Sequence, residues 1–160
     1  MKLNKAGFSL IELLAVTLIL AILTSVAVPQ YRRSVQRAET IEAMTNLRSL
    51  FDSAKRYKSF HSEVPTRLKG LDISFFDAST DDGDFDIGKF HYSFENSMIK
   101  ACRNDKGNTT TTYCINAYYK HPSLGLDAMT CSWTAGGKFD WVCPSIGKTQ
   151  VDTNDEYTLS

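Results

Sequence analysis

One acidic residue, Glu12, lies inside an otherwise uncharged apolar stretch that runs from Phe8 to Val28. A carboxylate in apolar surroundings is costly unless a partner lies beside it, so by default it marks a functional position. Helical hydroxyls can bond back to the carbonyls of their own helix, which accommodates the other polar residues of the stretch: Ser9, Thr17, Thr24 and Ser25. The pattern therefore indicates ion pairing rather than catalysis.

The apolar stretch has the length of a membrane span. As a helix, the 21 residues from Phe8 to Val28 would be roughly 31 Å long, close to the thickness of a bilayer's hydrocarbon core. Lys2 and Lys5 precede the stretch, and Pro29 and Gln30 close it.

The residues around Glu12 also form a recognisable signal. Lys5–Leu14 reads Lys-Ala-Gly-Phe-Ser-Leu-Ile-Glu-Leu-Leu, and the apolar run that follows ends in Pro-Gln-Tyr. This arrangement resembles the class III signal of type IV prepilins and related pseudopilins. In that family a prepilin peptidase cuts after the glycine and methylates the new N-terminus. The resemblance implies cleavage between Gly7 and Phe8, with Phe8 becoming N-methylphenylalanine.

Cleavage at this position would give Glu12 a partner. It creates a positive amine at Phe8, four residues from the Glu12 carboxylate. In a filament the amine of one subunit could meet Glu12 of its neighbour, which would favour one axial register of docking. The alternative that Glu12 pairs only with its own N-terminus stays open.

Two other interpretations compete for this segment. A cleaved secretory signal has a short apolar core and a small-residue cleavage site at its far end, whereas Pro29 directly follows Val26-Ala27-Val28 here. A plain signal anchor fits the length but leaves Glu12 unexplained. Both therefore fit the residues less well than the prepilin signal.

Charge and cysteine usage limit the partners and the compartment. Eighteen Lys and Arg balance eighteen Asp and Glu, which argues against a polybasic nucleic-acid binder. The positive-inside rule is nearly balanced, because Lys2 and Lys5 precede the apolar stretch and arginines follow it. All four cysteines follow the stretch, at positions 102, 114, 131 and 143, and suit an oxidising compartment. We therefore expect a cytoplasmic N-terminus and a periplasmic head in a bacterial inner membrane.

The helix is expected to continue beyond the membrane to about Tyr57. Apolar residues recur every three or four positions from Tyr31, which predicts an amphipathic helix. Pro29 removes one backbone hydrogen bond and should kink the helix or permit local melting. The expected segments are a leader at 1–7, a transmembrane and polymerisation helix at 8–29, an amphipathic helix at 30–58 and a head at 59–160. Packing of this helix on a sheet is favoured over a coiled coil.

The head is predicted to be an antiparallel sheet of three or four strands, which makes the fold class α+β. Alternation around Phe90–Phe94 and the aromatic, β-branched run Tyr113–Tyr119 predict two strands. Cys131–Thr134 and Phe139–Cys143 read as a hairpin with a Gly136-Gly137 turn. Residues 58–88 read as a connecting loop.

The four cysteines allow three pairings into two disulfides. The sequence-local pairing joins Cys102 to Cys114 and Cys131 to Cys143, and each bond should contribute roughly 2–3 kcal/mol. A carboxy-terminal disulfide loop also resembles the surface-presented region of type IV pilins, which supports a pilin over many secretion pseudopilins.

No catalytic site or cofactor is expected. His61, His91 and His121 are isolated in sequence, and the chain has no phosphate-binding glycine loop. The acid-rich run Asp77–Asp86 fails the EF-hand pattern, which leaves a looser calcium site as the alternative to a solvated loop. Asn108-Thr109-Thr110 matches a short glycan acceptor pattern, but reads better as a polar loop. We expect neither a metal site nor an enzyme.

Together these features predict a structural subunit of a type IV pilus that polymerises through its N-terminal helix. The alternatives are a minor pilin or pseudopilin of a secretion or competence filament, and a single-pass anchored binding domain that never polymerises. The resemblance implies as partners other copies of the chain, the prepilin peptidase, the inner-membrane assembly platform and, before assembly, the lipid bilayer. Nucleic acid is not indicated, and the use of the fibre in adhesion, motility or DNA uptake stays open.

Overall fold

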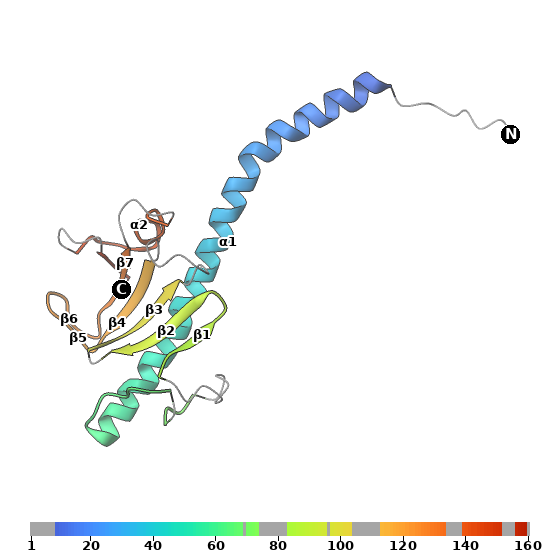
Figure 1. Ribbon diagram of the computed structural model, residues 1–160. Coiled ribbons are helices and arrows are strands. Elements are labelled where there is room, and N and C mark those ends of the chain that lie inside the picture. The colour runs from blue at the N-terminus through green and yellow to red at the C-terminus, as the bar shows by residue number, and fades with distance from the viewer. Residues whose placement is uncertain are drawn as a thin grey trace. The chain divides into compact units, whose positions relative to one another are not determined.

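The computed structural model describes residues 9–68, 70–73, 83–95, 97–103, 113–133, 139–151 and 156–159. The chain forms two compact units, Met1–Ala38 and Glu39–Ser160. Helix α1, Leu10–His61, contributes to both (Figure 1). The predicted long helix is thus present, and it ends at His61 rather than near Tyr57.

In the first unit, α1 satisfies its own polar groups as the sequence predicts. The Thr17 hydroxyl donates to the Leu14 carbonyl over 3.0 Å, Thr24 donates to Leu20 over 2.8 Å, and Ser25 donates to Ile22 over 2.7 Å. Pro29 lies inside the helix, which continues through it as one element, so the structure contains no local melting there. The kink stays a prediction.

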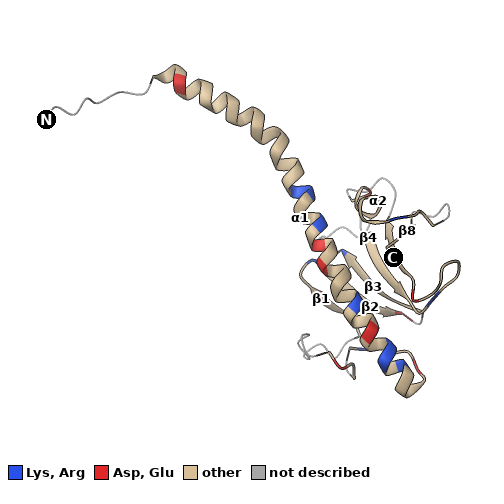
Figure 2. Ribbon diagram, turned by 180° about the vertical axis from the view of Figure 1, so that it is seen from behind, with Lys and Arg blue, Asp and Glu red and all other residues tan. Residues whose placement is uncertain are grey.

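The apolar side chains of this first unit are not covered by any part of the chain that the structure describes. Every large hydrophobic residue from Leu10 to Val28 in the described helix is exposed, with fractions between 44% and 85%. Figure 2 shows the helix ribbon uncharged between Glu12 and the arginines that begin at Arg32. By length and composition, α1 could cross a membrane, and its most apolar window has a mean hydropathy of 2.5.

The second unit is built on a six-stranded antiparallel sheet with the order β1-β2-β3-β4-β7-β8 (Figure 1). Its strands are β1 Phe85–Ile87, β2 Phe90–Glu95, β3 Met98–Arg103, β4 Tyr113–Tyr118, β7 Met129–Trp133 and β8 Glu156–Thr158. A separate small pair consists of β5 Lys120–His121 and β6 Gly125–Leu126. The second helix is α2 Val142–Ile146.

The C-terminal part of α1 covers one face of this sheet, as the predicted fold class requires. Strand register places side chains of four neighbouring strands on the helix-facing side, in the row Tyr92, Ala101, Ile115 and Cys131. They join one core cluster with residues from the helix: Ala43, Leu47, Leu50, Phe51 and Ala54. Burial of such side chains contributes about 1.5–3 kcal/mol each, which makes this core the main force holding helix and sheet together.

A charged cluster adds orientation to this apolar contact. Arg103 is 4% exposed, and its guanidinium donates to Glu39 of α1 over 2.8 Å while lying 4.8 Å above the Phe139 ring. The second carboxylate oxygen of Glu39 accepts a 2.7 Å hydrogen bond from Lys89. Burial raises the pKa of Glu39, but the hydrogen bonds from Lys89 and Arg103 outweigh it and hold that pKa below its usual value.

Two disulfides fasten the sheet in the sequence-local pairing, Cys102 to Cys114 and Cys131 to Cys143. The first joins directly opposed residues of β3 and β4. The second ties β7 to α2, so that α2 is held against the sheet.

The structure corrects two predictions for the head. The sheet has six strands rather than three or four. The hairpin over Cys131–Cys143 is also wrong, because β7 pairs with β4 and β8, and Phe139–Trp141 and α2 follow instead of a strand. Pro144 is the physical reason: it cannot donate to a sheet ladder but is tolerated in the first turn of a helix. The predicted Gly136-Gly137 turn lies outside the described residues.

We predict that Glu39→Gln lowers the free energy of unfolding of the head by about 1–3 kcal/mol, because the buried Arg103 loses its counter-charge. Lys89→Gln is the matched control. Its side chain is 56% exposed, so the loss of its charge should cost under about 1 kcal/mol. Denaturant unfolding followed by circular dichroism measures both, and equal effects would contradict the anchoring role of Arg103.

The same pair gives a pH dependence. Because the pKa of Glu39 is lower in the folded protein than its ordinary value of 4.5, its contribution is complete above about pH 5 and is lost as the pH falls below about 4.5. Wild type should lose more stability between pH 5 and 3 than Glu39→Gln does, and parallel stability curves would contradict this assignment.

A second stability prediction concerns Gly147, which ends α2. A Cβ there would lie 2.4 Å from the Tyr157 Cβ, so Gly147→Ala should destabilise the contact between α2 and β8 by about 1–3 kcal/mol. Gly88→Asn is the control, because a Cβ at Gly88 meets nothing within 4 Å and asparagine tolerates its φ of +61°. Thermal unfolding of both variants tests this, and a smaller loss for Gly147→Ala would refute the steric account.

Candidate assembly site

The N-terminal end of α1 carries the residues that the sequence marks for assembly. Gly7 and Phe8, the predicted cleavage and methylation positions, lie outside the described residues. Ser9 directly precedes the first helical residue, Leu10, and Glu12 is the third residue of the helix. Glu12 therefore lies in the first turn of the helix, four positions after the predicted new N-terminal residue in sequence.

The Glu12 carboxylate caps its own helix. Its Oε2 accepts a 2.9 Å hydrogen bond from the Ser9 backbone N–H, and the Ser9 carbonyl accepts the first helical bonds from Glu12 and Leu13. This is one half of a capping box, in which a third-position glutamate reaches back to the N-cap residue. An acid in the first turn is also favoured by the helix dipole. Glu12 is consequently held at the helix end before any neighbour arrives.

Sequence reasoning missed this role of Ser9. The signal was present in the sequence, since Ser9-Leu10-Ile11-Glu12 has the Ser-x-x-Glu spacing of a capping box. The second carboxylate oxygen, Oε1, makes no hydrogen bond to any residue that the structure describes. One oxygen of Glu12 thus serves the helix, and the other remains available to a donor from outside it.

The three histidines do not form a common site. The Nδ1 of His61 donates to the Tyr57 carbonyl over 3.2 Å, and the Nδ1 of His91 lies 2.9 Å from Asp86. His121 is buried, and its Nδ1 accepts the N–H groups of Ser123 and Leu124, both over 3.1 Å. Among the described residues no group of three or more acids, histidines and cysteines could hold a metal ion.

Two other predicted features fall mainly outside the described residues. Of the acidic run Asp77–Asp86, only residues 83–86 are described, and Asp84 and Asp86 lie on either side of the His91 ring. The triplet Asn108-Thr109-Thr110 lies wholly outside the described residues.

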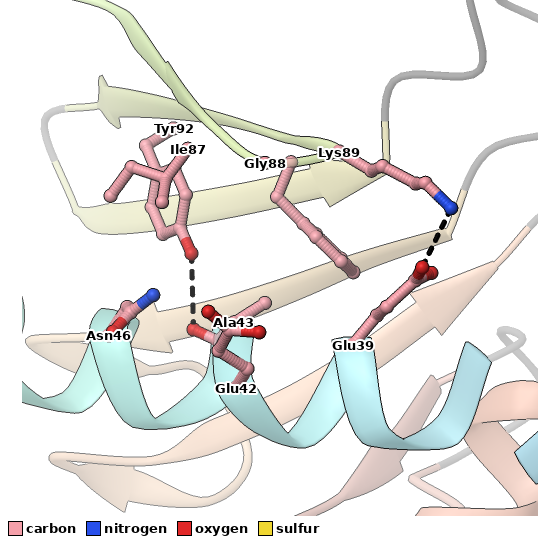
Figure 3. A pocket seen from close by; sticks show the side chains of 9 residues that line it. Glu39, Glu42, Ala43, Asn46, Ile87, Gly88, Lys89 and Tyr92 are labelled. Carbon is pink, nitrogen blue, oxygen red and sulfur yellow. Dashed lines mark hydrogen bonds and ion pairs between the residues drawn. The ribbon is translucent and has the colours of Figure 1, made fainter. Parts of the chain in front are cut away.

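The second unit contains a cavity, lined by both apolar and charged side chains, that the sequence did not reveal. It has a volume of about 230 Å³ and lies between α1 and the turn joining β1 to β2 (Figure 3). Glu39, Glu42 and Asn46 approach it from the helix, Lys89 approaches it from the β1–β2 turn, and Tyr92 approaches it from β2. No short motif announces this site, because its two sides are about fifty positions apart in sequence.

Comparison with known proteins agrees with the fold and the N-terminal geometry. Residues 2–28 match the family model of the prokaryotic N-terminal methylation motif. The chain is 37% identical over 65 residues to the type IV major pilin protein PilA of Myxococcus xanthus, which covers 36% of this chain and 30% of that protein. It is 32% identical over 71 residues to the type II secretion system core protein G of Aeromonas hydrophila, covering 44% of this chain and 50% of that protein.

A third relative aligns over most of the chain. It is the type IV major fimbrial protein FimA of Dichelobacter nodosus, which is 25% identical over 149 residues and covers 89% of this chain and 90% of the relative. The chain spans only 30% and 50% of the first two relatives, whereas it spans nearly all of FimA. No solved structure matches this chain.

A methylation motif, an uncovered apolar helix and a disulfide-bonded sheet packed on its C-terminal part define a pilin-like protein with an N-terminal anchor. The chain carries the prokaryotic N-terminal methylation motif and is similar in sequence to type IV pilins and to type II secretion pseudopilins.

Proposed function

We propose that the chain is the precursor of a type IV pilin, cut after Gly7, N-methylated at Phe8 and polymerised through the first part of α1 into a surface filament. The observation that carries this proposal is the uncovered apolar helix with Glu12 at its start. Such a surface requires either lipid or neighbouring copies of the same helix to cover it. The precursor is held in the bacterial inner membrane by this helix, with the head on the periplasmic side.

The Glu12 carboxylate supplies the specificity of assembly. Its Oε2 is occupied by the Ser9 N–H, and its Oε1 is the acceptor for the Phe8 amine of an adjacent subunit. Pairing these charges in an apolar setting favours the one axial position at which both are satisfied. A subunit docked at any other position leaves two charges unpaired. In this mechanism the partners are other copies of the chain, the prepilin peptidase that cuts it and the membrane platform that extrudes it.

A second candidate function has its own support. Core protein G of Vibrio cholerae is 34% identical over 69 residues and that of Dickeya chrysanthemi is 31% identical over 71 residues, so the chain could instead build a short type II secretion filament. The longer alignment with FimA and the two disulfides of the head favour the pilin. Deletion of the gene separates the two functions, because loss of bulk surface fibres indicates a major pilin, and unchanged fibres with lost protein secretion indicate a pseudopilin.

We predict that the mature protein begins with N-methylphenylalanine at Phe8. Mass spectrometry of the protein from sheared surface fibres measures this, and Gly7→Glu should leave the chain uncut because its bulk blocks the peptidase. A native chain that begins at Met1 and stays a monomer in the bilayer would contradict both the cleavage and the filament.

We also predict that Glu12→Leu is cut normally but yields at least roughly tenfold less sheared filament, because the neighbour's amine then has no counter-charge. Glu12→Gln is the matched control for charge, since it keeps the side-chain shape and should fail to a similar degree. Filament is measured by immunoblot of the sheared fraction against the cell-bound mature chain. Normal fibres from either variant would refute the pairing mechanism.

A further inference from the structure

The cavity beside Glu42 has the chemistry to hold a long cationic side chain. Ile87 and Phe90 form apolar walls, while the Tyr92 hydroxyl and the Asn46 amide are polar groups inside it (Figure 3). Burial raises the pKa of Tyr92 to about 12, so its hydroxyl stays protonated and donates to the Ala43 carbonyl over 3.4 Å. Asn46 is also a hydrogen-bond partner of this hydroxyl, so its oxygen keeps one lone pair for an incoming N–H.

The two acids at this cavity are in different states. Glu39 already accepts hydrogen bonds from both Lys89 and Arg103, so it is neutralised within the chain. Glu42 is exposed and forms no hydrogen bond or ion pair with any residue in the described part of the chain. Among the described residues, the cavity therefore offers one carboxylate without a counter-charge, next to apolar side chains that suit the methylene stem of an arginine or lysine.

The basic segment of α1 is the complementary feature. Between Leu13 and Ala38 the charged residues are Arg32, Arg33 and Arg37, with no acid among them. Copies anchored by the same end in one membrane run parallel, so this segment of one copy can lie beside the acidic positions of another. Charge complementarity thus points to a second copy as the occupant.

Sequence separation selects one arginine from the three. Phe8 and Glu12 are four positions apart, and Arg37 and Glu42 are five apart. An axial shift of four residues, about 6 Å at 1.5 Å of rise per residue, brings the Phe8 amine of one copy level with Glu12 of another. The same shift brings Arg37 of the first copy to within one residue, about 1.5 Å, of the level of Glu42 in the second. Arg32 and Arg33 would miss this level by about 8–9 Å, judged by the same rise.

We propose that the cavity at Glu42 receives Arg37 of a neighbouring copy in the filament, where the guanidinium pairs with Glu42 and contacts Asn46 and Tyr92. Arg37 also interacts within its own chain, so docking exchanges one partner for another. This inference rests on the proposed polymerisation and adds a second charge contact, outside the membrane, that shares its axial register.

Charge reversal in the full-length chain tests the pair. Glu42→Arg and Arg37→Glu should each reduce sheared filament roughly tenfold or more, with normal leader cleavage and normal amounts of cell-bound mature chain. The double variant, Arg37→Glu with Glu42→Arg, should restore filament to within about threefold of wild type, because the pair is re-formed with reversed sign. Arg32→Glu combined with Glu42→Arg is the matched control and should not be rescued.

Cross-linking gives a readout that does not depend on assembly yield. Co-expressed variants that each carry one added cysteine, Arg37→Cys and Glu42→Cys, should form a disulfide-linked dimer in oxidised filaments, whereas Arg32→Cys with Glu42→Cys should form much less. Filaments unaffected by the charge reversals, a double variant without rescue, or Glu42→Cys linked to a different protein would overturn the inference. If wild type itself forms no filament, the proposed function fails as well, so the two failures are distinguishable.

Discussion

The exposed apolar surface of α1 in the first unit is the constraint on which the rest of the structure depends. A helix whose Leu, Ile and Val side chains are about half exposed or more from Leu10 to Val28 cannot remain so in water. Two environments can cover it, the hydrocarbon of a bilayer and a bundle of identical helices. Because both are apolar, moving from one to the other changes the hydrophobic free energy little, and the choice must be made by weaker, more directional interactions. A carboxylate at Glu12 is such an interaction, since its charge distinguishes lipid from a correctly placed amine.

In the head, too, apolar burial supplies the attraction between elements and charge fixes their orientation. Leu47, Leu50 and Phe51 supply most of the attraction between helix and sheet, but a smooth apolar stripe allows several rotations of a helix. Glu39 accepts hydrogen bonds from β3 through Arg103 and from the β1–β2 turn through Lys89, so only one rotation satisfies both. The buried charge pair contributes little net stability compared with an apolar substitute. We infer that its effect is to fix the orientation of the sheet on the helix.

The sequence predicted well those features that repeat locally. The period of three to four in α1, the alternation in β2 and the Gly7–Glu12 motif are all readable within about ten residues. It failed where one residue depends on a distant partner. Arg103 puts a charge in the helix-facing row of β3, where Ile99 and Ala101 are apolar, and its counter-charge is Glu39, 64 positions earlier. Strand β8 has three residues and pairs with β7 about 26 positions away, so it carries no local pattern. The hairpin prediction was wrong because the two cysteines and the glycine pair are typical of a hairpin, whereas Pro144 favours the start of a helix over a strand.

The capping bond at Ser9 changes how the proposed ion pair between subunits should be understood. In the proposed mechanism, cleavage after Gly7 would leave the Phe8–Ser9 peptide intact, so the Ser9 N–H would stay on Oε2 of Glu12 before and after processing. The carboxylate of a waiting subunit is therefore partly satisfied in the bilayer, which lowers the cost of keeping a charge there. The amine produced by cleavage lies at the positive end of the helix dipole and is disfavoured there. In this proposed arrangement, pairing with a neighbour stabilises the amine more than the carboxylate. The amine of each incoming subunit would therefore supply most of the electrostatic free energy of its docking.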